Sequence, residues 1–215
     1  MRAPFFAVVC AAIFAAVLAT SFFARAQDEM EMFFGQQPKP YIDPKGFWAA
    51  ILPAGFDCKA KARHVECSGN RGARSLLTVD VIDVPASATA DIAMLNQLDR
   101  FKQKPHFKLI SKGTTKIDKI PAVTVSFTYD HLNSVELAVG VQQLIFVRSG
   151  KLYLLHFESG LGDLQTYRRD LEQLYRSFHP ARLDAGGNPI LEDLKPRDFD
   201  PDKLSDVDRA LKNGY

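Results

Sequence analysis

The residue types that most often carry catalysis occur here without the spacing that catalysis needs. No two of the five histidines form an H-E-x-x-H or H-x-H pattern, and Ser159 lacks the flanking glycines of a nucleophile elbow. No phosphate-binding loop or dinucleotide-binding glycine pattern occurs either. The sequence therefore predicts no catalytic residue and no cofactor, with a hydrolase whose site is assembled from scattered residues as the alternative. The histidines are His64, His106, His131, His156 and His179.

His156 alternates with Leu155 and Phe157 in a predicted strand. Such alternation is typical of a strand with one buried face, so we expect His156 to be a sheet residue rather than a metal ligand.

The clearest charge feature is a basic segment between residues 100 and 119, which holds seven basic residues and one acidic residue, Asp118. Basic side chains gathered on one face would attract an anionic partner such as lipid headgroups or a polyanion. The alternative is a solvated helix end followed by a solvated strand. The predicted anion-binding face comprises Arg100, Lys102, Lys104, Lys108, Lys112, Lys116 and Lys119.

The C-terminal region is acidic, with eight acidic and three basic residues between positions 184 and 208. Asp198, Asp200 and Asp202 alternate as the first ligands of a calcium loop do. The sixth position of that loop is not glycine and the twelfth is Arg209, which excludes an EF-hand. A weak calcium site remains one interpretation, and a solvated tail or one that covers the basic segment is the other.

Residues 1–26 have the pattern of a secretory signal. Arg2 is followed by an apolar run from Ala3 to Phe23, and Ala24-Arg25-Ala26 resembles a peptidase site. A retained membrane anchor is the alternative, because a run of this length could span a bilayer. Removal of Arg2 and Arg25 would leave 25 basic against 25 acidic residues, a formal charge of zero. A neutral chain does not favour nucleic-acid binding.

Two cysteines, Cys58 and Cys67, remain after the predicted cleavage. A matched pair in an exported chain predicts a disulfide, because the compartments outside the cytoplasm are oxidising. The alternative is a metal site made by the two cysteines with His64, but it has three ligands and no paired C-x-x-C spacing.

The hydrophobic pattern predicts an α+β fold, an antiparallel sheet of about six to eight strands with two main helices. The first helix is expected to be capped by Ser87 or Thr89 and to end before Pro105, and the second to run from about 163 to 178. The apolar stripe of the first helix is predicted at Ile92, Leu95, Leu98 and Phe101. The strands are expected at 47–52, 56–61, 64–68, 76–84, 107–114, 122–129, 135–148 and 151–157.

Several short motifs resemble one family. They are Gly46-Phe47-Trp48, Leu52-Pro53-Ala54-Gly55-Phe56, Ile120-Pro121-Ala122, Gly150-Lys151-Leu152-Tyr153-Leu154 and Tyr175-Arg176-Ser177-Phe178. In this order they are similar to the PsbP-like group, which includes the photosynthetic PsbP subunit, the Ran-binding Mog proteins and the bacterial envelope protein DcrB. The resemblance implies an α/β/α sandwich in a protein that binds other proteins rather than catalyses. It carries over no functional residue, and neither the cysteine pair nor the acidic tail belongs to its pattern.

These observations predict four regions: a signal at 1–26, a polar leader at 27–45, a PsbP-like domain at 46–182 and an acidic extension at 183–215. We expect an exported protein, periplasmic or extracellular, that binds a protein partner or supports envelope assembly. An ion- or surface-binding module that uses the acidic tail or the basic segment is the other alternative. Contact with a membrane surface would then be peripheral, with no transmembrane segment after cleavage.

Overall fold

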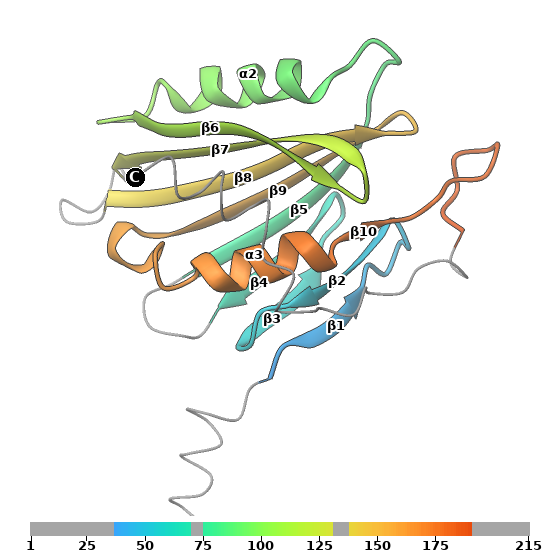
Figure 1. The fold of residues 1–215 in the computed structure, drawn as a ribbon, viewed down its shortest axis with the longest axis horizontal. Coiled ribbons are helices and arrows are strands. Elements are labelled where there is room, and N and C mark those ends of the chain that lie inside the picture. Colours follow the sequence, from blue (N-terminus) through green and yellow to red (C-terminus); the bar gives the residue numbers. More distant parts are fainter. Residues whose placement is uncertain (1–36, 70–74, 131–137, 191–215) are drawn as a thin grey trace, which may run out of the picture. The chain divides into compact units, whose positions relative to one another are not determined.

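The fold is built on a seven-stranded antiparallel sheet of strand order β3-β4-β5-β9-β8-β7-β6 (Figure 1). The computed structural model describes residues 37–69, 75–130 and 138–190, so the predicted signal peptide lies outside the described residues. The antiparallel sheet with two main helices confirms the predicted α+β class. The strands are β3 (Phe56–Ala60), β4 (His64–Gly69), β5 (Ser75–Asp83), β6 (Lys108–Ile117), β7 (Ile120–Asp130), β8 (Ala138–Arg148) and β9 (Lys151–Gly160).

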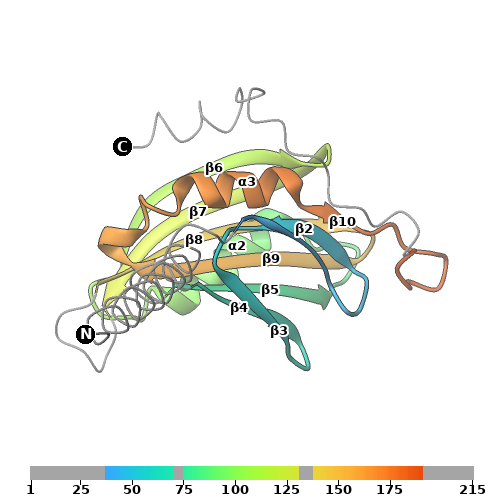
Figure 2. The ribbon, with the colours of Figure 1, turned by 90° about the horizontal axis from the view of Figure 1, so that it is seen from below.

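The two helices lie on opposite faces of this sheet (Figures 1 and 2). Residues of β7 alternate between the faces: Val125 and Phe127 pack under α2 (Ala90–Phe101), whereas Thr124 and Ser126 face the side of α3 (Arg168–Ser177). This alternation follows from the two-residue period of a strand. In β7 it gives an apolar side under α2 and a partly polar side on the other face.

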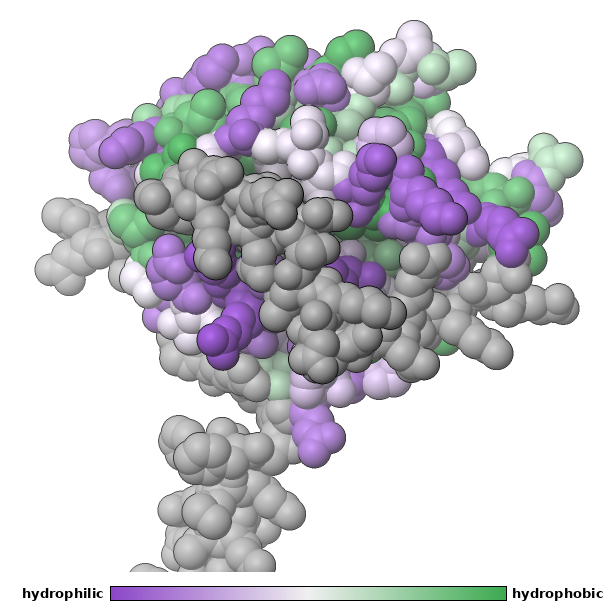
Figure 3. All heavy atoms as spheres, in the orientation of Figure 1, coloured by the Kyte–Doolittle hydropathy of each residue, from purple (hydrophilic) through white to green (hydrophobic). Residues whose placement is uncertain are grey.

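Helix α2 begins where the sequence predicts, with the Thr89 hydroxyl accepting a hydrogen bond from the Ile92 amide at 3.3 Å. Its predicted apolar stripe is partly wrong. Met94 and Leu98 are buried on β7 and β8, whereas Ile92 and Leu95 are 51% and 50% exposed. The helix carries apolar residues on two different faces, and the face that contains Met94 is the one that packs on the sheet. Apolar side chains therefore lie among polar ones on the solvent side of α2 (Figure 3).

The second predicted helix is shorter than expected. A single 3-10 turn, η1 (Leu161–Asp163), precedes it, and α3 begins only at Arg168, without a side-chain cap. Leu171, Leu174 and Tyr175 then form its buried face, as the apolar stripe predicts.

A small second sheet was not expected. It has the strand order β1-β2-β10, with β1 (Lys39–Ile42), β2 (Trp48–Leu52) and β10 (His179–Pro180). Strand β1 lies in the segment predicted to be a polar leader. Residues 39–42 of that segment are instead a strand of the small sheet. Three of its four side chains are exposed, and the fourth, Tyr41, packs on Trp48 at a centroid distance of 5.3 Å. Backbone pairing with β2 and this one contact hold the strand without a repeating hydrophobic pattern. Residues 183–190, placed in the C-terminal extension, fold back through a bridge between Leu183 and Pro189.

The main core lies between the large sheet, the small sheet and α3. Trp48 of β2 stacks on Phe178 at a centroid distance of 5.3 Å, and Phe146 stacks on Tyr153 at 4.7 Å. Aromatic rings thus join the two sheets to the end of α3.

Candidate functional site

A narrow slot of about 70 Å³ lies between α3 and the end of the large sheet that carries β6, β7 and β8. Ser111, Ser126 and Gln142 lie beside one another across these three strands and line it. Gly113 and Thr124 form the neighbouring pair of the same wall. These side chains are too small to fill the space beside α3 as leucine or phenylalanine would, and a polar slot results.

The most informative residue of the slot is Tyr175 of α3. The residue is 5% exposed, and its hydroxyl has no hydrogen-bond partner among the described residues. Burial raises the pKa of this phenol, so it remains protonated and can donate a hydrogen bond. A buried hydroxyl without a hydrogen-bond partner lowers the stability of the fold. A ligand atom that accepted its hydrogen bond would therefore be bound favourably at this place.

Three basic residues, Lys112, Lys116 and Arg176, and no acidic residue are among the residues that border the slot. The ammonium of Lys112 lies 3.7 Å from Asp91, next to α2, and Lys116 pairs with Pro121 on the same face of the sheet as Lys112. Both lysines therefore lie on the α2 face of β6. The Tyr175 hydroxyl, without a partner among the described residues, is the donor that the slot offers to a hydrogen-bond acceptor.

The basic segment that contributes two of these residues does not form one face. Lys108 pairs with Thr128 and Lys112 with Val125, which lie on opposite faces of β7. Lys102 forms an ion pair with Asp99 at 2.8 Å. Lys104 lies over the Tyr129 ring, Arg100 is on α2, and Lys119 is in the β6–β7 turn. Three of the lysines, Lys108, Lys112 and Lys116, lie along the edge strand β6.

A second polar cluster surrounds His156, on the α2 side of the sheet. His156 lies in β9, as predicted, where Nδ1 is 2.8 Å from Gln143 Nε2 and Nε2 is 3.4 Å from Glu158 Oε2. The Tyr129 hydroxyl donates to the same Glu158 oxygen at 3.2 Å, and Phe101 stacks on the imidazole. Both ring nitrogens thus have protein partners, an arrangement that orients the ring.

Asp80 lies at the margin of this cluster, opposite His64 in the β4–β5 ladder. Burial raises the pKa of its carboxyl above the ordinary 3.8, and the charges of His64, His156 and Arg100 counteract this in part. The folded chain therefore binds this proton more tightly than the unfolded chain, and stability falls as pH rises above the ordinary value.

We accordingly expect Asp80→Asn to raise the thermal unfolding midpoint at pH 7, where the parent carboxyl is charged. The difference should vanish on acidification below the ordinary pKa, where both side chains are neutral. Unfolding followed by circular dichroism across this pH range measures it. The same difference at every pH would show that the charge of Asp80 is not responsible.

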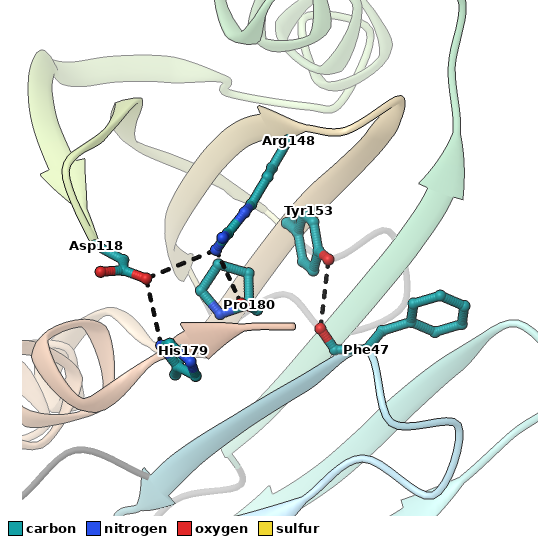
Figure 4. A network of polar contacts seen from close by, with 6 residues as sticks. All are labelled: Phe47, Asp118, Arg148, Tyr153, His179 and Pro180. Carbon is teal, nitrogen blue, oxygen red and sulfur yellow. Dashed lines mark hydrogen bonds and ion pairs between the residues drawn. The ribbon is translucent and has the colours of Figure 1, made fainter. Parts of the chain in front are cut away.

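A third network fixes the end of the slot at the β6–β7 turn (Figure 4). Asp118 Oδ2 lies 3.6 Å from Arg148 Nη1 and 3.3 Å from His179 Nδ1. Arg148 also donates to the Pro180 carbonyl at 2.9 Å, and the Tyr153 hydroxyl donates to the Phe47 carbonyl at 3.3 Å. The turn that ends β6 is thus tied to the segment that follows α3, which holds the two walls of the slot together.

Sequence comparison gives no match to this chain, either among protein-family models or among curated proteins. Solved structures do match. The Ran-binding protein Mog1p of Saccharomyces cerevisiae superposes with a TM-score of 0.52 at 10% identity, over 67% of this chain and 96% of Mog1p.

The chain has the PsbP-like/Mog1 fold. Cyanobacterial PsbP (CyanoP) of Synechocystis sp. PCC 6803 also matches, with a TM-score of 0.48, 17% identity, and coverage of 66% of this chain and 91% of CyanoP. LpqN, involved in cell envelope biogenesis of Mycobacterium tuberculosis, matches with a TM-score of 0.48, 10% identity, and coverage of 66% and 89%. The resemblance found in the sequence is confirmed at the level of the fold.

Cys58 and Cys67 form a disulfide across the β3–β4 hairpin, where they are directly opposite each other. Both sulfurs are used in this bond, which removes the metal-site alternative with His64. Among the described residues no group of three or more metal-ligating side chains occurs. Asp198, Asp200 and Asp202 lie outside the described residues, as does His131.

No helix within the described ranges is long and apolar enough to cross a membrane. His106 contacts Asp130, and His64 lies 3.8 Å from Glu66, so each of these two histidines has an acidic neighbour.

The residues of the slot were not singled out from the sequence. Tyr175 belongs to the apolar stripe of α3, where a tyrosine looks like any other core residue. The available signal was that small polar residues, Thr124 and Ser126, alternate along β7 with large apolar residues that face the other side of the sheet. It becomes meaningful only when the pairing with Ser111 and Gln142 is known.

Proposed function

We propose that this chain is an exported, periplasmic protein of the PsbP-like type that binds a protein partner and supports envelope assembly, without catalysing a reaction. The observation that carries this proposal is the slot. It has buried polar groups but a volume of about 70 Å³, room for one side chain rather than for a metabolite. Small-molecule sites are typically about 300 to 1,000 Å³. The open groove between the start of α2 and the β6–β7 end of the sheet has about 690 Å³, so the volume argument applies to the slot alone.

Two further observations support the proposal. The fold is that of a Ran-binding protein over nearly all of that protein's length, which gives a precedent for protein binding on this scaffold. The Cys58–Cys67 disulfide suits an oxidising compartment, in agreement with the signal pattern of residues 1–26.

The partner is expected to dock where the slot opens beside β6. This strand is at the end of the large sheet and pairs only with β7 among the described strands, so its outer edge is available for contact. We therefore place the binding surface on the β6 edge and the adjoining slot.

Site-specific photocrosslinking in the native cells tests this function. A photoreactive residue at Thr114, exposed on β6, should give a covalent adduct of one defined mass with one envelope protein. The matched control carries it at Lys59, exposed on β3 at the opposite edge of the sheet, and should give no such adduct. Equal labelling at both positions would contradict a specific partner on β6.

Export is tested in the same cells. Intact-mass measurement of the periplasmic fraction should show a chain that begins at Gln27. Full-length protein confined to the cytoplasm would contradict the export part of the proposal.

A further inference from the structure

We propose that the slot binds an uncharged carboxamide, the side chain of a glutamine, and that this glutamine belongs to an extended segment of the partner that pairs with the outer edge of β6. The inference rests on the proposed function and names the chemistry that the partner presents at the same site.

Buried polar side chains that the fold leaves without partners surround the slot. Ser126, Gln142 and Tyr175 are 6%, 9% and 5% exposed. The Tyr175 hydroxyl has no partner, and no hydrogen bond within the described ranges uses the side chain of Ser126 or Gln142. Buried polar groups without hydrogen bonds lower the stability of the fold, so an occupant that supplies these bonds is bound favourably.

The slot offers no free charge to its occupant. Lys112 and Lys116 lie on the α2 face of β6, and Arg176 has a partner of its own. The described lining contains no acidic residue. Transfer of a charged group from water into a site without a counter-charge costs far more than transfer of a neutral polar group. We therefore expect an uncharged occupant.

The hydrogen-bonding groups and the volume of the slot favour a carboxamide. Its oxygen accepts a hydrogen bond from the Tyr175 hydroxyl, and its N–H groups donate to the side-chain oxygen of Gln142 or Ser126. The volume of about 70 Å³ corresponds to roughly two water molecules at about 30 Å³ each. The hydroxyl of a serine or threonine would leave part of this space empty, whereas the larger carboxamide fills more of it.

The edge strand favours an extended segment and a long side chain. From Ser111 to Ile117 the pairing of β6 with β7 is regular, and a segment added along this stretch would extend the sheet through backbone hydrogen bonds. Neighbouring strands are about 4.8 Å apart, so a side chain of the added segment must cross β6 to enter the slot. Gly113 borders the slot on β6 and has no side chain to block this path. Glutamine reaches farther across the strand than asparagine.

The sequence of β6 argues against a second copy of this strand as the occupant. Lysine on an edge strand discourages pairing with the same strand of another copy, because like charges would then face each other. Strand β6 carries Lys108, Lys112 and Lys116, and it contains no glutamine or asparagine. We therefore assign the added segment to a different protein.

Fluorescence anisotropy with a labelled probe peptide tests the inference on the chain from residue 27 to 215. The probe is a short capped peptide of alternating threonine and valine with one central glutamine. Two control peptides carry glutamate or methionine in its place, which keep the length of the side chain but add a charge or remove the amide. A third control has N-methyl groups on the backbone. The glutamine peptide should bind roughly tenfold more tightly than either side-chain control, and N-methylation should abolish binding.

Two tyrosine variants assign the effect to the slot. Tyr175→Phe removes only the unpartnered hydroxyl and should weaken binding of the glutamine peptide roughly tenfold. Tyr153→Phe removes a hydroxyl that is hydrogen-bonded to Phe47 outside the slot and should leave binding unchanged. Thermal unfolding of both variants shows that each is folded.

Two glycine variants test the path across β6. A Cβ added at Gly113 lies 3.1 Å from Thr124 Oγ1, so Gly113→Ala narrows the entrance of the slot and should weaken binding of the glutamine peptide about threefold or more. Gly162→Ala is the matched control, because a Cβ at this position meets no atom within 4 Å. It should leave binding unchanged.

Three results would overturn the inference: equal affinity for the glutamine peptide and either side-chain control, unchanged binding by Tyr175→Phe or Gly113→Ala, or binding that appears only after deletion of residues 27–36 or 191–215. In the first case the slot holds water only, and in the last a segment of this chain, not a partner, is the occupant. If Thr114 crosslinks to one partner while the peptides show no preference for glutamine, the proposed function stands and only the inference fails.

Discussion

Replacement of Phe178 by alanine is expected to lower the free energy of unfolding by about 3–5 kcal/mol. Phe178 is fully buried directly after α3, stacked on Trp48 and edge-on to Phe146 and Tyr153. Truncation removes apolar contact and leaves a cavity where the two sheets and the helix meet. Because the contacts of Phe178 include both sheets, the loss should affect the whole domain rather than one element.

Urea unfolding followed by fluorescence of Trp48, the only tryptophan, measures this change. The matched control is Leu95→Ala, which truncates an apolar residue that is 50% exposed on α2 and should change stability by less than about 0.5 kcal/mol. A cost below about 1 kcal/mol for Phe178→Ala would mean that Phe178 does not join the sheets.

The strands of the large sheet could be predicted because each of them carries its own signal. In β7, for example, Val123, Val125, Phe127 and Tyr129 alternate with smaller polar residues, and all four are buried under α2. The start of α2 was predictable for the same reason, since Thr89 caps its own helix through a local hydrogen bond. Local periodicity and capping need no knowledge of the rest of the chain.

The remaining features depend on contacts between distant segments. Strand β1 is formed by backbone pairing with β2, which leaves no side-chain pattern in residues 39–42. The choice between Ile92 and Met94 as a core residue is made by the apolar face of β7 and β8, which α2 meets only in the folded chain. The slot likewise requires Ser111, Gln142 and Tyr175, which come from three separate elements.

Removal of the Cys58–Cys67 disulfide is expected to lower the free energy of unfolding by about 2–3 kcal/mol, because the bond closes a short loop and restricts the unfolded chain. Strand β3 is at the edge of the large sheet and pairs only with β4 among the described strands, so the bond also holds an edge strand in place. Urea unfolding with and without a thiol reductant measures the effect.

Reduction separates the crosslink from the packing of the cysteines. Cys67 is fully buried in the main core, so a variant with alanine at both positions loses apolar contact as well as the bond. The reduced parent keeps both side chains and should lose only the contribution of the crosslink. The double alanine variant should be less stable than the reduced parent and insensitive to reductant. If the parent unfolds at the same urea concentration with and without reductant, after loss of the disulfide has been verified by thiol labelling, the bond does not stabilise the fold. The contribution of β3 must then come from the β4 ladder and the burial of Phe56 alone.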